Sequence, residues 1–295
     1  MIPPWGVRTV ATLLFSTGVA LGVWGSPVVN IVAAENFYGS IAEQIGGDEV
    51  TVTSIMSDPN VDPREYGSNA ENVKAVSEAD LVIMNGGGYD GWMDRILSAS
   101  HGSHRVILRA SELAVKRLPG NERVWYSVDD IQAIGIAISK SLQELLPGKV
   151  EVFVRNDHAF QESLGPIREK MAIISGRYAG APVGITETVC LYQAVPLGLR
   201  VLTPFEYQKA MDQGKDPPAA SVEEMDSQIR QRKIRILICN DQAISSFGAR
   251  LLAEAKAANI PVVGMTETMP QGETYQTWML RQLDELRSAL IAAGS

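Results

Sequence analysis

Residues 151–178 have the sequence EVFVRNDHAFQESLGPIREKMAIISGRY, and this stretch separates two sets of short, apolar, strand-like segments. It contains no cluster of turn-forming residues long enough to make a flexible linker, so it predicts a long connecting helix over 149–178. The Gly165-Pro166 step predicts a kink in this helix, because proline lacks a backbone N–H and its ring clashes with the preceding turn. The stretch therefore predicts two lobes joined by a rigid helical connection.

The segments on either side of this helix are short, rich in Val and Ile, and bounded by Gly, Pro, Asn or Asp, as strands are. The first set lies at 28–34, 50–55, 80–85 and 105–110, and the second at 182–186, 200–203, 234–240 and 260–266. Helical patterns alternate with them, and serine caps are expected at Ser68, Ser127 and Ser221. This alternation predicts an α/β protein whose lobes, 27–148 and 179–295, are each a largely parallel sheet flanked by helices.

The N-terminal segment 1–26 has the composition of a signal peptide. One arginine in MIPPWGVR precedes the uncharged run VATLLFSTGVALGVWG, and small residues follow. We expect cleavage and export, to a periplasmic or extracellular location; an uncleaved N-terminal anchor is the alternative.

Charge and composition exclude several classes of function. The net charge is −8 and no stretch is strongly basic, so a nucleic-acid surface is not expected. The three histidines do not combine with a serine and an acid into a catalytic triad, and the sequence predicts a binding protein and not an enzyme. The run Gly86-Gly87-Gly88 lacks the Lys-Ser/Thr of a phosphate-binding loop and predicts a tight strand-to-helix turn.

Four polar segments follow predicted strands. Since ligands of parallel sheets bind at the carboxyl ends of the strands, these segments predict a cleft between the lobes. They are DPREYG (62–67), NGGGYDGW (85–92), TETVC (186–190) and NDQAISS (240–246).

Together with VAAENFYGSIAEQIGG (32–47), NERVWY (121–126) and IPVVGMTETMPQGETYQTWMLRQLDEL (260–286), these motifs resemble the zinc/manganese-type solute-binding proteins of ABC importers. The matches run in order across essentially the whole chain after residue 26. The resemblance implies two α/β lobes joined by a rigid helix, with a metal ion bound between them. It also implies a partner, the ABC permease in the inner membrane, to which the protein delivers zinc or manganese.

The resemblance also assigns site residues. Arg64 in DPREYG and Arg123 in NERVW stand where the family has histidine ligands, and Glu187 in TETV stands at the third ligand position. The fourth position falls in NDQAIS at 244 or 245, with Asp241 close enough to substitute. The predicted cleft residues are therefore Arg64, Arg123, Glu187 and Asp241, of which Glu187 and Asp241 could bind a metal.

Arginine has five N–H donors and no lone pair, so it cannot ligate a cation. Three alternatives stay open for Arg64 and Arg123: they point to solvent, they pair with Glu187 and Asp241, or they bind an anionic ligand or a metal complex. The corresponding functions are metal-ion import, import of an anion or metal complex, and adhesion or interaction on the same scaffold. Cys190 and Cys239 could pair or add soft ligands, but buried thiols are the expected state.

Overall fold

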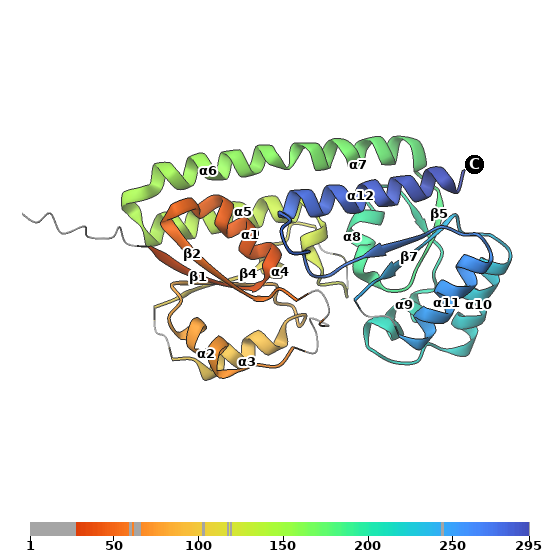
Figure 1. Ribbon diagram of the computed structural model, residues 1–295, viewed down its shortest axis with the longest axis horizontal. Coiled ribbons are helices and arrows are strands. Elements are labelled where there is room, and N and C mark those ends of the chain that lie inside the picture. The colour runs from red at the N-terminus through yellow and green to blue at the C-terminus, as the bar shows by residue number, and fades with distance from the viewer. Residues whose placement is uncertain are drawn as a thin grey trace, which may run out of the picture.

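The computed structural model describes residues 28–58, 61, 66–101, 104–116, 118, 120–242 and 245–294. The predicted signal segment 1–26 and Arg64 lie outside these residues. Two four-stranded parallel sheets confirm the predicted α/β class (Figure 1). Within the described part of the chain, no helix has the length and apolar character needed to cross a membrane.

The first sheet has the strand order β2-β1-β3-β4. Its strands are β1 (Val29–Glu35), β2 (Val50–Met56), β3 (Leu81–Met84) and β4 (Val106–Arg109). The helices of this lobe are α1 (Asn36–Gly46), α2 (Ala70–Ser77), α3 (Gly91–Ala99), α4 (Ala110–Leu113) and α5 (Val128–Leu145). One face of the sheet packs in the same apolar cluster as α1 and α5, and the other face packs on α2 and α3.

The second sheet has the order β6-β5-β7-β8. Its strands are β5 (Pro182–Ile185), β6 (Arg200–Val201), β7 (Ile236–Asn240) and β8 (Val262–Met265). Its helices are α8 (Leu191–Ala194), α9 (Phe205–Asp212), α10 (Ala219–Arg230), α11 (Ser246–Ala257) and α12 (Tyr275–Ala292). The helices α9, α10 and α11 cover one face, while α8 and α12 pack against the other.

The connection consists of two helices, α6 (Val150–Ser163) and α7 (Gly165–Tyr178), which run end to end across both lobes (Figure 1). The sequence predicted one helix kinked at Gly165-Pro166, and the structure instead has two helices that meet at Leu164. Pro166 lies in the first turn of α7, where a backbone N–H has no intrahelical partner in any case.

One apolar core runs through both lobes. It includes Phe37 of α1, Ile174 of α7, Ile238 of β7 and Trp278 of α12. The ring of Phe37 stacks on Trp278 at a centroid distance of 5.7 Å, so a side chain of the first lobe packs directly on a helix of the second. Because a shared close-packed core resists deformation, the lobes form a stiff frame around the space between them.

The three serine caps have different outcomes. Ser127 caps α5 as predicted, since its Oγ accepts the N–H of Asp130 at 3.2 Å. The cap of α2 is Asn69 and not Ser68, because the Asn69 carboxamide oxygen accepts the N–H of Asn72 at 2.8 Å. Ser221 lies inside α10 and donates to the carbonyl of Pro218, the residue at the N-cap position.

Candidate functional site

The loop that carries Arg123 belongs to the first lobe but is fastened to the second. The Leu118 N–H donates to the Tyr192 hydroxyl (3.0 Å), and that hydroxyl donates to the Asn121 carbonyl (2.9 Å). The Asn121 carboxamide donates to the Thr188 carbonyl (2.9 Å) and accepts the N–H of Arg123 (3.1 Å). These bonds fix the backbone from which the Arg123 side chain extends toward the second sheet.

The Arg123 guanidinium is buried between the lobes, with 6% of the residue exposed. Its Nε donates to Glu267 Oε2 at 3.2 Å, and its Nη1 donates to Thr188 Oγ1 at 3.1 Å and lies 3.7 Å from Asp212 Oδ1. Burial acts to lower the pKa of Arg123, but the charges of Glu267 and Asp212 outweigh it, and the pKa is raised. The site therefore contains a permanent, desolvated cation.

Two buried carboxylates share one amide donor. Asn240, the last residue of β7, donates from Nδ2 to Glu187 Oε2 (3.2 Å) and to Glu267 Oε1 (2.7 Å), and these two glutamates are 2% and 1% exposed. Gln242 holds the turn that carries Glu267, because its Oε1 accepts the N–H groups of Glu267 and Thr268. Glu187, Asn240 and Glu267 thus form one network, which Arg123 joins from the first lobe.

A cavity of about 380 Å³ opens beside this network. Its walls come from both lobes, with Gly87 and Tyr89 on one side and Thr188, Phe205 and Asp212 on the other, and Arg123 forms part of its lining. Within the described part of the chain, no three His, Cys, Asp or Glu side chains are grouped so as to hold a metal ion.

Acidic groups are also buried in the first lobe, close to Tyr89 of the cavity wall. Glu35, at the end of β1, is 1% exposed, and burial followed by the nearby charge of Asp90 raises its pKa well above its ordinary value. Asp90 accepts the N–H groups of Asn85 (2.7 Å) and Gly86 (2.8 Å), yet burial still raises its pKa. Burial is the main cause that raises the pKa of Tyr89, and the charge of Glu267 is the next. The phenol is therefore close enough to the interlobe network to be affected by its charge.

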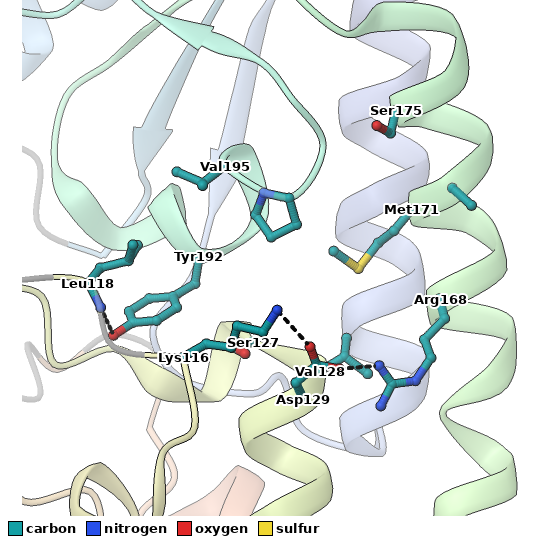
Figure 2. A pocket seen from close by; sticks show the side chains of 12 residues that line it. Lys116, Leu118, Ser127, Val128, Asp129, Arg168, Met171, Ser175, Tyr192 and Val195 are labelled. Carbon is teal, nitrogen blue, oxygen red and sulfur yellow. Dashed lines mark hydrogen bonds and ion pairs between the residues drawn. The ribbon is translucent and has the colours of Figure 1, made fainter.

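A second cavity, of about 480 Å³, lies between the start of α5, α7 and α8 (Figure 2). Met171, Tyr192 and Val195 give it mainly apolar walls. At its rim, Asp129 pairs with Arg168 (2.5 Å) and with Lys116 (3.5 Å), as Figure 2 shows. None of the predicted site residues lines this cavity, so the interlobe cavity is the better candidate for the functional site.

The sequence profile of the family described as zinc-uptake complex component A, periplasmic (ZnuA), matches residues 31–289. The chain belongs to the ZnuA family. Among curated proteins, it is 22% identical over 289 residues to the metal ABC transporter substrate-binding lipoprotein ScbA of Streptococcus cristatus. This alignment covers 90% of each chain. It is 29% identical over 147 residues to the zinc-binding protein TroA of Treponema pallidum, covering 48% of this chain and 46% of that one.

Solved structures with the same fold include the periplasmic zinc-binding protein TroA from Treponema pallidum. It superposes with a TM-score of 0.73 at 23% identity and covers 89% of this ZnuA-family chain and 99% of its own. The Mn²⁺ complex of the solute-binding protein FpvC from Pseudomonas aeruginosa gives 0.74 at 18% identity, with 90% and 99% covered. These likenesses confirm the two-lobe fold expected from the resemblance.

The structure places the four predicted site residues of this ZnuA-family chain differently. Arg123 and Glu187 lie in the interlobe network, so Arg123 does not point to solvent. Arg64 lies outside the described residues, as does residue 244, one of the two aligned with the fourth ligand position. The other, Ser245, caps α11 by accepting the N–H of Gly248 at 3.1 Å. The replacement of histidine by arginine at 64 and 123 stays a prediction.

Asp241 follows Asn240, the last residue of β7, and its carboxylate lies beside Cys239. It is exposed, its Oδ1 accepts the Cys239 thiol at 3.4 Å, and its carboxylate fills the space beside Gly264. Its role as a ligand remains a prediction. Cys239 is a buried thiol, as expected.

Glu267 is the site residue that the sequence reasoning missed. The signal was present in two near-identical segments, GITETV (184–189) and GMTETM (264–269), which place Glu187 and Glu267 at the same position after a strand. The comparison of these segments would have predicted a second buried carboxylate in the site.

Proposed function

We propose that this chain is the extracytoplasmic solute-binding component of a metal-ion ABC importer. It captures a divalent cation, zinc or manganese, between its lobes and delivers the cation to a permease in the membrane. The protein works by capture and not by catalysis. The observation that carries the proposal is the family match over residues 31–289.

The chemistry of the interlobe network supports this cargo. Carboxylate oxygens bind Mn²⁺ well and also ligate Zn²⁺, and Glu187 and Glu267 supply two carboxylates on one amide at the carboxyl ends of parallel strands. A cation bound there would contact the second lobe directly and the first lobe through the loop that carries Arg123. Relatives support the same range of cargo, since curated homologues are named as zinc-binding TroA and manganese-binding MntA.

The test measures the melting temperature of the chain without its predicted signal segment, 1–26. This protein is first stripped of metal with a chelator and then titrated with zinc or manganese chloride. A ligand present at 100 times its Kd stabilises the folded state by about 2.7 kcal/mol, which gives a clear rise. Glu187→Gln should abolish the rise, whereas Glu223→Gln, at a side chain that is 72% exposed, should preserve it. A rise produced by small anions but by neither metal would contradict the proposal.

A further inference from the structure

The Arg123 guanidinium is buried in the interlobe site, in the way that a bound cation would be, and does not form an exposed surface ion pair. Arg123 extends from the first lobe, and the partners of its side chain among the described residues are Glu267, Thr188 and Asp212, all of the second lobe. Its backbone is held by Asn121, so the guanidinium reaches this position from a fixed anchor. The site of the proposed cargo therefore already contains one positive charge.

The guanidinium and a cargo cation compete for the same oxygen atoms. Glu267 Oε2 accepts from Arg123 Nε, and the lone pair that accepts this N–H cannot ligate a metal at the same time. A divalent ion next to the guanidinium would also meet charge repulsion in a poorly solvated site. Arginine cannot relieve this repulsion by losing a proton.

We propose that Arg123 is a resident cation of the interlobe site, which a divalent cargo must displace from Glu267, and that it thereby sets the affinity of the site for divalent cations. This inference rests on the proposed function, because it concerns the same site. Arg123 acts here as a specificity-determining residue, and not only as a structural contact between the lobes. A purely structural contact would affect stability, while a resident cation also affects metal affinity.

The experiment compares zinc and manganese affinities, measured by calorimetric titration against a competing chelator, for the exported form and four variants. Arg123→Met removes the charge at similar length and should bind at least one metal roughly 100-fold more tightly, since breaking a buried pair leaves a carboxylate that needs a cation. Adding Glu267→Gln to Arg123→Met should abolish the gain. Arg250→Met is the matched control, because Arg250 also pairs with two carboxylates, Asp226 and Glu254, but within the second lobe.

The fourth variant, Arg123→Lys, covers the case in which Arg123→Met does not fold. Lysine retains the charge at neutral pH but can release its proton, so its manganese affinity should exceed that of the unmodified chain increasingly as the pH rises. An affinity equal to that of the unmodified chain at every pH would overturn the inference.

The outcomes separate the inference from the proposed function. If the unmodified chain binds neither metal and Arg123→Met binds one, the inference stands and the proposed cargo fails. If the unmodified chain binds a metal and Arg123→Met binds it no more tightly, the proposed function stands and the inference is overturned. If neither protein binds a metal, both are overturned.

Discussion

Replacing Glu35 by glutamine should change how stability depends on pH. Glu35 is 1% exposed, and its carboxyl group lies close to that of Asp90. Burial, followed by the charge of Asp90, raises its pKa well above the ordinary value of 4.5. Over the pH range between the ordinary pKa of Glu35 in the unfolded chain and its raised pKa in the folded chain, the folded chain keeps a proton that the unfolded chain has released.

The sign follows from proton linkage. Because the folded state binds more protons, the contribution of Glu35 to stability is fully present below pH 4.5 and declines as the pH rises toward the folded pKa. One proton corresponds to a slope of about 1.4 kcal/mol per pH unit. The contribution is therefore lost at up to this slope over the pH range between the ordinary pKa and the raised one. Glu35→Gln cannot ionise and should not show this loss.

The assay is urea unfolding at pH 5, 6, 7 and 8, with the free energy of unfolding extrapolated to water. The difference between Glu35→Gln and the unmodified chain should shift in favour of the variant as the pH rises. Glu151→Gln, at an exposed position of α6, is the control for general effects of charge. A difference for Glu35→Gln that stays constant across these pH values would refute the reasoning, since it would mean that Glu35 ionises alike in both states.

Two further predictions concern packing and the interlobe network. Gly135→Ala should destabilise by roughly 1–3 kcal/mol, because the new Cβ would lie 2.8 Å from the ring of Phe160 where α5 meets α6. Gly176→Ala, also inside a helix but with no atom within 4 Å of its Cβ, should instead stabilise by about 0.5–1 kcal/mol in the same denaturation assay. Asn240→Ala should lower the free energy of unfolding by at least about 2 kcal/mol, because two buried carboxylates lose a hydrogen-bond donor. A decrease below about 0.5 kcal/mol would show that water replaces the amide.

The fold was predictable from the sequence because its signals are local. Short β-branched segments alternate with helical ones, and an irregularity of the connecting helix near Pro166 follows from the chemistry of one residue. Helix starts were less predictable: Ser68 and Asn69 can both cap a helix, and only the backbone shows that Asn69 accepts the N–H of Asn72. For Arg123 the sequence left open exposure to solvent, pairing with carboxylates and binding of an anion, and it did not identify the partner Glu267, which is distant in sequence.

The order of strands explains how two glutamates that are distant in sequence, Glu187 and Glu267, come to share the Asn240 amide. In the order β6-β5-β7-β8, strand β7 lies between β5 and β8, so the two Thr-Glu-Thr segments that follow those strands flank the end of β7. Ile185 pairs with Ile238 and Asn240 pairs with Met265, which brings Glu187 and Glu267 each within reach of the Asn240 amide. The resemblance placed the fourth ligand position at 244 or 245, with Asp241 as a possible substitute, and it did not point to Glu267. Any chain of this architecture with matched acidic segments after the two strands beside a central strand should therefore present a carboxylate pair at the carboxyl end of that strand.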